Sequence, residues 1–216
     1  MEFDSIFLGQ PVFKYHVPLE VFVALNELYA THKKLLPNAN KQLAGKILDE
    51  VSLFYAGPTN KKMHMHSYVS EDLMKWFYSI FSHYLKTNKI ERPHLDINSI
   101  WVNEMKAGDY NPVHVHRGKL FTGLSSVMIL KLPKDMGAEI ARPEEPMNGQ
   151  LQFLGNVAGQ FVTSDYSPRM RIGDFYVFPY DIRHVVYPFT NKKEKRRTLV
   201  CNCDVDYDVV GSRTTQ

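Results

Sequence analysis

The stretch GDFYVFPYDIRH at residues 173–184 decides the fold that we expect for this chain. It opens with the turn pair Gly173-Asp174, and residues 175–178 then form a short apolar run rich in β-forming side chains. Pro179 ends the run, because proline cannot donate a backbone hydrogen bond to a neighbouring strand. His184 follows shortly afterwards. The pattern predicts a buried strand that is closely followed by a histidine.

Short strand-like runs of this kind recur throughout the second part of the chain. Turn residues separate them, for example Gly108-Asp109, Gly149 and Asn191. Many short strands after leading helices are typical of an α+β fold, and here they predict a jelly-roll core (a double-stranded β-helix) over residues 93–208. We expect its strands at residues 97–105, 127–132, 151–154, 175–178 and 198–203.

The N-terminal part, residues 1–92, is expected to be mainly helical support for this core. A first helix opens at Pro18 and carries apolar residues at helical spacing, and a second is expected at residues 42–54. Ser70 is a typical N-cap, and the broad apolar face after it predicts a helix that lies across a sheet. We expect residues 1–216 to form a single domain.

Composition excludes several classes of protein. Hydrophobic residues make up 44% of the 216 residues, enough for a core, and the formal net charge of +3 is too small to indicate a nucleic-acid partner. The tightest basic run, residues 192–197, fits a solvated turn. The sequence has neither a signal-peptide pattern nor an apolar run long enough to span a membrane. Cys201 and Cys203 would share one face of a strand, a poor geometry for a disulfide, so we expect a cytoplasmic protein.

The motif His114-Val115-His116 is the sharpest local candidate for a metal site. Side chains at positions i and i+2 of a strand face the same side, so both imidazoles can reach one ion. Imidazole suits iron, zinc and copper. A second pair, His64-Met65-His66, lies in a polar stretch without a strong strand pattern, and we interpret it as solvated or structural.

A basic residue opens the last expected strand. Arg196 and Thr198 stand two positions apart and therefore share one face, whereas Arg197 should point outward. Asn202 continues the inward face of Thr198 and fits a hydrogen-bonded amide in the core.

In their order and spacing, these elements resemble the 2-oxoglutarate/Fe(II) oxygenase superfamily. The likeness runs from Trp101 to Asp204 and is greatest to a prolyl-hydroxylase-like group that includes uncharacterised proteins of bacteria and tailed phages. The family pattern has a Gly-x-Tyr turn, a His-x-Asp/Glu pair, a distal histidine after a Gly…Phe-Pro strand, and an Arg-x-Ser on the last strand. It is matched here by Gly108-Asp109-Tyr110, by His114, by residues 173–179 with His184, and by Arg196-Arg197-Thr198.

The resemblance implies Fe(II) as the metal and 2-oxoglutarate as the co-substrate. It further implies that His114 and His184 bind the metal, which the keto-acid end of 2-oxoglutarate chelates. Arg196 would then bind the distal carboxylate, and the Thr198 hydroxyl would add a hydrogen bond from the same face.

Two positions depart from the family pattern. Met105 stands where many relatives carry a tyrosine that touches the co-substrate, and His116 stands where the family has a metal-binding carboxylate. We favour a site of three histidines. The alternative is that His116 lies behind the ligands and that a carboxylate, Asp181 or Glu104, completes the site.

These expectations predict an enzyme that hydroxylates a C–H bond while 2-oxoglutarate is decarboxylated to succinate. The resemblance favours a prolyl or other amino-acid residue of a protein or peptide as substrate, then a small molecule, and nucleic acid is less favoured. Two rival hypotheses remain: a cupin-like three-histidine metalloenzyme that does not use 2-oxoglutarate, and a non-catalytic jelly-roll binding or assembly module. The sequence leaves open the oligomeric state and the role of the proline-rich loop at residues 133–148.

Overall fold

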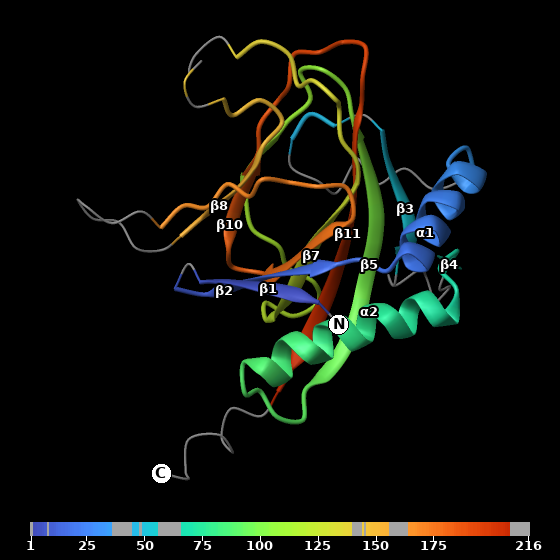
Figure 1. The fold of residues 1–216 in the computed structure, drawn as a ribbon. Helices are drawn as coiled ribbons and strands as arrows, with labels where there is room; N and C mark the ends of the chain where they lie inside the picture. Colours follow the sequence, from blue (N-terminus) through green and yellow to red (C-terminus); the bar gives the residue numbers. More distant parts are fainter. Residues whose placement is uncertain are drawn as a thin grey trace.

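A computed structural model describes residues 2–7, 9–35, 45–47, 49–55, 66–139, 144, 146–155 and 164–207 of the chain. Both of its helices precede β5 in the described part (Figure 1). In chain order the elements are β1 (Phe3–Phe7), β2 (Pro11–His16), α1 (Leu19–His32), β3 (Asp49–Tyr55), β4 (His66–Ser67), α2 (Glu71–Thr87), β5 (His94–Met105), β6 (Asn111–His114), β7 (Gly123–Lys131), β8 (Leu151–Leu154), β9 (Asp174–Pro179), β10 (Arg183–Val186) and β11 (Arg196–Asp206).

Two sheets build the core of the fold. Within the described residues, the larger sheet has eight strands in the order β1-β2-β9-β7-β11-β5-β3-β4, and the smaller has three in the order β6-β10-β8. Neighbouring strands are antiparallel, as in the long ladder of β11 with β5. Buried side chains from both sheets, such as Trp101 and Val200 of the larger and Phe153 of the smaller, pack in one cluster. This arrangement is the double-stranded β-helix that the sequence predicts.

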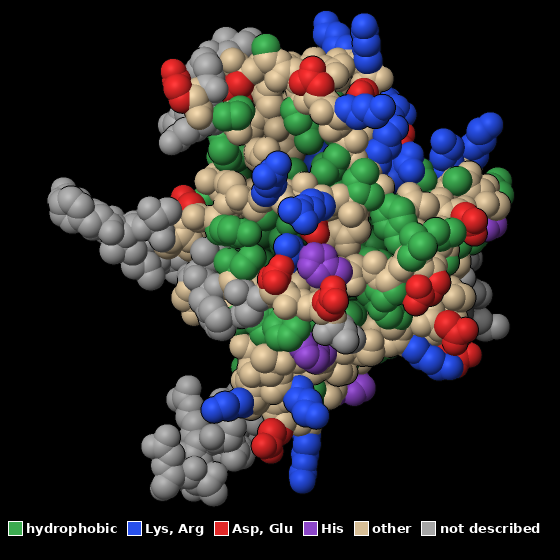
Figure 2. Space-filling view, viewed as in Figure 1, with side chains coloured by type: hydrophobic (Ala, Val, Ile, Leu, Met, Phe, Trp, Pro, Cys, Tyr) green, Lys and Arg blue, Asp and Glu red, His purple; other side chains and the backbone are tan. Residues whose placement is uncertain are grey.

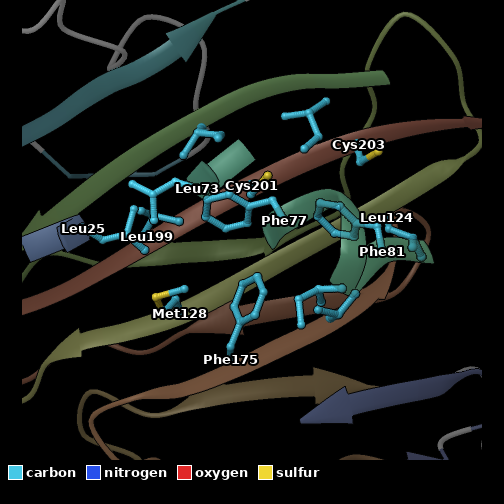
Figure 3. Packing of buried hydrophobic residues seen from close by; sticks show 14 of the residues in the cluster. Leu25, Leu73, Phe77, Phe81, Leu124, Met128, Phe175, Leu199, Cys201 and Cys203 are labelled. Atoms are coloured by element: carbon cyan, nitrogen blue, oxygen red, sulfur yellow. The ribbon is translucent and has the colours of Figure 1, made fainter. Parts of the chain in front are cut away.

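The helices cover one face of the larger sheet (Figure 1). Helix α2 begins after Ser70, whose hydroxyl accepts a hydrogen bond from the Leu73 N–H, as expected for an N-cap. Its apolar side chains, among them Phe77 and Phe81, pack against strands β7 and β11 (Figure 3). Since this face of the strands is used for the helices, the opposite face can line the space between the two sheets.

The surface charges agree with the low net charge of the sequence, and the cysteines agree with the expectation that they do not form a disulfide. Figure 2 shows acidic and basic side chains interspersed over one face of the molecule. Cys201 and Cys203 are free thiols, buried in the helix–sheet cluster on the same side of β11. Among the described residues, no helix is both long and apolar enough to cross a membrane.

The N-terminal part contains strands that the sequence analysis missed. β1 and β2 form a hairpin, and β2 pairs with β9, the strand in the stretch that decided the fold. The helix expected at residues 42–54 is wrong at residues 45–47, where Lys46 forms an isolated bridge with Tyr110, and from residue 49 onward, where the chain forms β3 and pairs with β5. Residues 42–44 and 48 lie outside the described residues. Residues 1–92 are thus helical only in part, because these strands are stabilised by pairing with distant strands, which local periodicity does not reveal.

The five strands expected in the second part of the chain are all present, β8 with the expected bounds and the other four with shifted ones. They correspond to β5, β7, β8, β9 and β11. Strands β6 and β10, which were not expected, are only four residues long. These two short strands carry His114 and His184, so the smaller sheet is the part of the fold that positions the candidate site.

Candidate metal centre

Three histidines converge between the two sheets. His114 ends β6 and is the cross-strand partner of His184 in β10, and the centroids of their rings lie 4.2 Å apart. His116 stands just beyond β6, and its Nε2 lies 3.2 Å from the Nε2 of His184. One potential ligand atom from each histidine lies within 4.8 Å of the others. The structure therefore brings together all three histidines that the sequence singled out.

Backbone carbonyls determine which ring nitrogen faces the centre. The Nδ1 of His114 lies 2.7 Å from the carbonyl oxygen of Pro112, and the Nδ1 of His184 lies 3.0 Å from that of Ile182. A carbonyl can only accept, so both Nδ1 atoms carry the proton. The Nε2 atoms of His114 and His184 are left unprotonated, as metal ligation requires.

Burial keeps the three imidazoles neutral. Desolvation, together with the smaller effect of the neighbouring His114, lowers the pKa of His184 to about 3. Desolvation likewise lowers the pKa of His114 and lowers that of His116 well below its ordinary value. Neutral imidazole is the form that binds a metal ion, so the cluster requires no deprotonation at neutral pH before it can take one.

The alternative carboxylates do not reach the histidines. Asp181 accepts hydrogen bonds from the Gln10 side chain at the surface, the shorter at 2.8 Å. Glu104 lies on the other face of β5, where Lys195 and Arg197 donate hydrogen bonds to it. Neither acid is placed to complete the site. The second motif, His64-Met65-His66, lies outside the described residues except for the backbone of His66 in β4, so its interpretation stays a prediction.

Arg196 is a buried cation without an anion among the described residues. Its side chain is 1% exposed, and its guanidinium donates only to the sulfur atoms of Met105 and Met170, at 3.5 and 3.6 Å. Its Nε has no hydrogen-bond partner in the described structure. Burial lowers the pKa of Arg196 to about 10, which still leaves the guanidinium charged at neutral pH. Such a group is a prepared binding site for an anion.

Arg196 and the histidines line one and the same pocket. Thr198 lines the same pocket and is the cross-strand partner of Asn103 in the ladder of β11 with β5. The walls come from both sheets and from the segment before β3. They are formed by Ile47, Trp101, Asn103, Met105, Asn111, His114, His116, Val127, His184, Val186, Arg196, Thr198 and Val200.

Three polar residues of this pocket were missed by the sequence analysis: Asn111, whose Nδ2 lies 3.4 Å from the Nε2 of His114, and Trp101 and Asn103 on β5. Trp101 and Asn103 are 6% exposed, and the Trp101 Nε1 and Asn103 Oδ1 atoms have no hydrogen-bond partner among the described residues. Both alternate with Met105 along β5, so strand periodicity places them on one face. What the sequence does not reveal is that this face lines the pocket.

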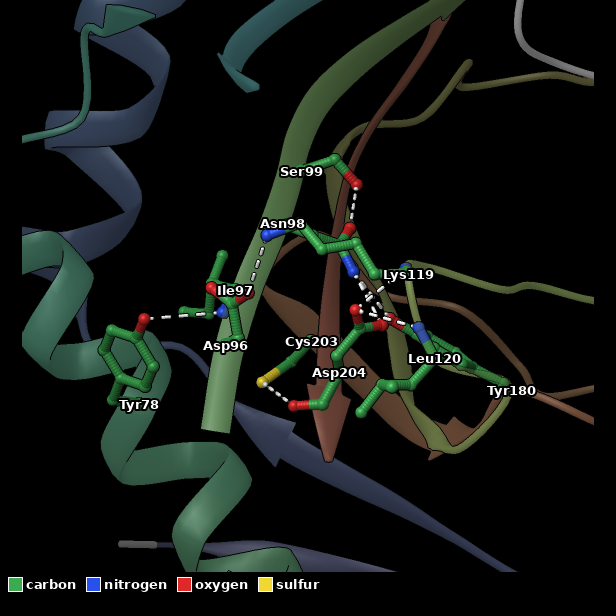
Figure 4. Close-up of polar contacts among 10 residues, drawn as sticks. All are labelled: Tyr78, Asp96, Ile97, Asn98, Ser99, Lys119, Leu120, Tyr180, Cys203 and Asp204. Atoms are coloured by element: carbon green, nitrogen blue, oxygen red, sulfur yellow. Dashed lines mark hydrogen bonds and ion pairs between the residues drawn. The ribbon is translucent and has the colours of Figure 1, made fainter. Parts of the chain in front are cut away.

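A buried carboxylate fixes the segment that follows His116 (Figure 4). Asp204 accepts hydrogen bonds from the backbone N–H groups of Lys119 and Leu120, at 2.9 and 3.2 Å, and from the Tyr180 hydroxyl at 3.1 Å. The carbonyl of Tyr180 in turn accepts from the backbone N–H of His116 at 2.9 Å. His116 lies beyond the end of β6, where the ladder with β10 has ended. These hydrogen bonds position it instead.

Arg197 lies on the face opposite to Arg196, as alternation predicts, but it does not simply point into solvent. It pairs with Glu104, and its guanidinium carbon lies 4.3 Å from the ring centroid of Tyr29 in α1. The expectation of an outward residue is corrected accordingly, because α1 covers this part of the sheet. Described parts of the loop at 133–148 fold against residues 190–191.

Fold and site together define a jelly-roll protein with a histidine cluster and a buried arginine in its interior. Residues 99–202 match the protein family described as "Putative 2OG-Fe(II) oxygenase", which confirms the resemblance seen in the sequence. The donor set fits the two groups that this description names: imidazole nitrogen suits Fe(II), and an unpaired guanidinium suits the carboxylate of 2-oxoglutarate.

Solved structures with the same fold include several oxygenases. A prolyl-4-hydroxylase of Pseudomonas putida is 14% identical with a TM-score of 0.53, and the match covers 89% of this chain and 91% of that one. A prolyl hydroxylase of Trichoplax adhaerens, solved with a peptide of hypoxia inducible factor, is 12% identical with a TM-score of 0.54, over 95% and 87% of the two chains. At these identities the likeness establishes the fold. No curated protein matches the chain in sequence.

Proposed function

We propose that this protein is an Fe(II)- and 2-oxoglutarate-dependent dioxygenase that hydroxylates a C–H bond. In this proposal His114, His116 and His184 hold the iron, and Arg196 with Thr198 holds the distal carboxylate of 2-oxoglutarate. Residues 1–216 would act as a single domain in the cytoplasm, with the catalytic core at residues 93–208.

One observation carries the proposal: a buried arginine, with no anionic partner among the described residues, shares its pocket with a cluster of neutral histidines. A buried charge without a partner is costly, and a protein can avoid the cost by placing methionine or leucine there. The cost is offset if an anionic ligand occupies the pocket during function. A ligand with a carboxylate at one end and a metal-chelating group at the other fits both ends of this pocket.

The residues of the chain have distinct tasks in this scheme. When bound, iron and 2-oxoglutarate supply the oxidation of a C–H bond by O₂, coupled to decarboxylation of the keto acid to succinate. The histidines present neutral nitrogen atoms, two of them oriented by backbone carbonyls. Apolar walls such as Ile47 and Val186 exclude water and strengthen the attraction between Arg196 and a carboxylate.

As substrate we propose an amino-acid residue of a protein or peptide, for instance a prolyl residue. The support is the shared fold with prolyl hydroxylases, one of them solved with a peptide fragment. A small-molecule substrate is the alternative. A cupin-like three-histidine enzyme would have no use for Arg196 beside Thr198, and a non-catalytic module would need neither the metal nor the anion.

An anaerobic titration tests class and co-substrate together. Protein loaded with Fe(II) should develop a visible charge-transfer band when 2-oxoglutarate is added. The band arises because light can then transfer an electron from the metal to the keto acid that chelates it. Succinate, which has the carboxylates but no keto group, is the matched control and should give no band. If stoichiometric iron binds but 2-oxoglutarate produces no band, the cupin-like alternative is favoured. If no iron binds, the non-catalytic module is favoured.

A further inference from the structure

Asn202 joins the third histidine of the cluster to a buried serine. The amide is 5% exposed and lies on β11. Its Nδ2 is 3.4 Å from the Nδ1 of His116, and its Oδ1 accepts a hydrogen bond from the hydroxyl of Ser125 in β7 at 2.7 Å. Unlike His114 and His184, His116 thus has its outer nitrogen beside an amide and not beside a backbone carbonyl.

In this arrangement each of these contacts pairs a donor with an acceptor without a metal ion. The Nε2 of His184 is an acceptor, because its Nδ1 donates to the carbonyl of Ile182. The Nε2–H of His116 can therefore donate to it across 3.2 Å. The Nδ1 of His116 is then unprotonated and accepts from the Asn202 amide nitrogen. Ser125 completes the chain by donating to the amide oxygen.

Metal ligation by His116 requires the opposite protonation of its ring. A neutral imidazole that binds a metal through Nε2 carries its proton on Nδ1, which then needs an acceptor. The rings around His116 belong to Trp101, His114, Phe178, Tyr180 and His184. A half-turn of the Asn202 amide would bring its oxygen to Nδ1 and its nitrogen to the Ser125 oxygen. The same three side chains can thus satisfy both protonation patterns.

We propose that Asn202 is a positioning residue whose amide turns over when metal binds and so selects the ligating form of His116. The inference rests on the proposed metal site. It also explains why an amide and not a carboxylate stands at this position. Aspartate would accept from Nδ1 but could not donate to it, and it would leave a buried negative charge in the metal-free protein. An amide serves both states without a charge.

Three variants separate this role from packing. Asn202→Leu keeps the volume but removes both donor and acceptor, whereas Asn202→Asp keeps only the acceptor. Ser125→Ala removes the hydroxyl that donates to the Asn202 amide oxygen, at the far end of this series of hydrogen bonds. Ser126→Ala is the matched control, because the Ser126 hydroxyl is equally buried but bonds to the backbone of Cys201 on the other face of β7.

The first readout is the protonation pattern of the ring, followed by ¹⁵N nuclear magnetic resonance of labelled histidine. In the parent, we expect the His116 proton on Nε2 without metal and on Nδ1 after addition of Zn²⁺ as a diamagnetic probe. In Asn202→Asp the proton should already be on Nδ1 without metal. A parent ring with its proton on Nδ1 in both states would overturn the proposed turnover of the amide.

The second readout is anaerobic Fe²⁺ affinity at pH 8. Loss of a hydrogen-bond partner behind a metal ligand typically costs about 10- to 100-fold in affinity, which is the loss expected for Asn202→Leu. Asn202→Asp should retain binding, Ser125→Ala should show a smaller loss, and Ser126→Ala should match the parent. If Asn202→Leu binds Fe²⁺ as tightly as the parent, the inference is wrong while the metal site stands. If the parent itself binds none, the proposed function fails as well.

Discussion

His114 and His184 are cross-strand partners, paired in the ladder of β6 with β10, and their rings are in contact. Both also donate Nδ1–H to a carbonyl of a residue two positions earlier in the chain. The strand pairing and the hydrogen bond from Nδ1 thus hold the two rings in the same way. The two residues are pre-organised as a pair, so we expect their removal to have equivalent effects.

His114→Ala and His184→Ala should each abolish stoichiometric Fe(II) binding. Each change removes a neutral Nε2 from a cluster whose ligand atoms lie within 4.8 Å of one another. Anaerobic calorimetry together with iron analysis of the purified protein measures the loss. His94→Ala at the exposed start of β5 is the control and should bind iron as the parent does. Unchanged affinity in either cluster variant would show that the replaced histidine is not a ligand.

Strands with strong local signals were predicted from the sequence, and strands defined by their partners were not. The run at residues 175–178 has turn residues before it and a proline after it, so the sequence itself indicates where this strand begins and ends. The sequence also has a turn pair, Gly57-Pro58, after β3, but β3 pairs with the distant β5, which local periodicity does not reveal, and the helix expected at residues 42–54 was wrong there. β6 and β10 are too short to show periodicity and exist as strands mainly through each other and β8.

The candidate site was predictable to the extent that spacing within one strand determines it. The alternation along β11 placed Arg196 and Thr198 on one face and Arg197 on the other, as the structure has them. The partners of Arg197 could not be predicted, because they depend on where α1 lies over the sheet. The contact of Asn202 with His116 likewise depends on a segment that no strand ladder holds.

His116→Asp should retain iron and change the spectrum of the metal centre. The substitution restores the two-histidine, one-carboxylate set that is usual for non-haem iron oxygenases and makes the site one charge more negative. Electron paramagnetic resonance of the nitric oxide adduct of the Fe(II) protein is a suitable measurement. His116→Ala should bind iron more weakly than either. If His116→Ala binds iron as tightly as the parent, His116 is not a ligand.

Arg196→Met should weaken 2-oxoglutarate binding while leaving Fe(II) binding nearly intact. Methionine fills similar space beside Met105 and Met170 but leaves the bound carboxylate without its partner. Truncating one partner of a buried charge pair typically costs ~2–5 kcal/mol. This corresponds to roughly 30- to several-thousand-fold in affinity. Thr198→Val should lose about 1 kcal/mol, the value of one hydrogen bond.

Calorimetric titration of 2-oxoglutarate into the metal-loaded variants measures these losses. Lys193→Ala removes the same charge from an exposed position of the preceding turn and is the matched control. Arg196→Lys keeps the charge but not the paired hydrogen bonds, and it should fall between the parent and Arg196→Met. Equal affinity in the parent and Arg196→Met would remove 2-oxoglutarate from this end of the pocket.

Arg197→Ala should destabilise the fold without weakening co-substrate binding. The change leaves the buried Glu104 with Lys195 as its remaining cation and removes a contact with Tyr29, a loss of roughly 1–3 kcal/mol. Urea unfolding at pH 7 measures the loss, and titration of 2-oxoglutarate into the same variant provides the comparison. Weaker 2-oxoglutarate binding in Arg197→Ala than in Arg196→Met would show that the two residues have exchanged roles.

The same ion pair predicts how stability falls in acid. Burial alone raises the pKa of Glu104, but the hydrogen bonds from Lys195 and Arg197 outweigh it and hold the pKa below its ordinary value. A carboxyl with a lowered pKa in the folded state contributes stability above its unfolded pKa of about 4.5 and loses it as the pH falls. The deficit of Arg197→Ala should therefore shrink below pH 4.

Glu50 should give the opposite pH dependence. Its side chain on β3 is 2% exposed, and burial, followed by the charge of Asp109, raises its pKa to about 7. A carboxyl whose pKa is raised on folding lowers the stability of the folded protein at pH values where the group is ionised. This cost is absent below pH 4.5, grows between pH 4.5 and 7, and is complete above pH 7.

Glu50→Gln, which cannot ionise, should therefore gain stability over the parent at pH 8 by on the order of 1–3 kcal/mol and show little gain at pH 4.5. Urea unfolding of both proteins at the two pH values measures the difference, with Glu91→Gln at an exposed position as the control. A gain of equal size at both pH values would indicate an effect of packing and not of charge.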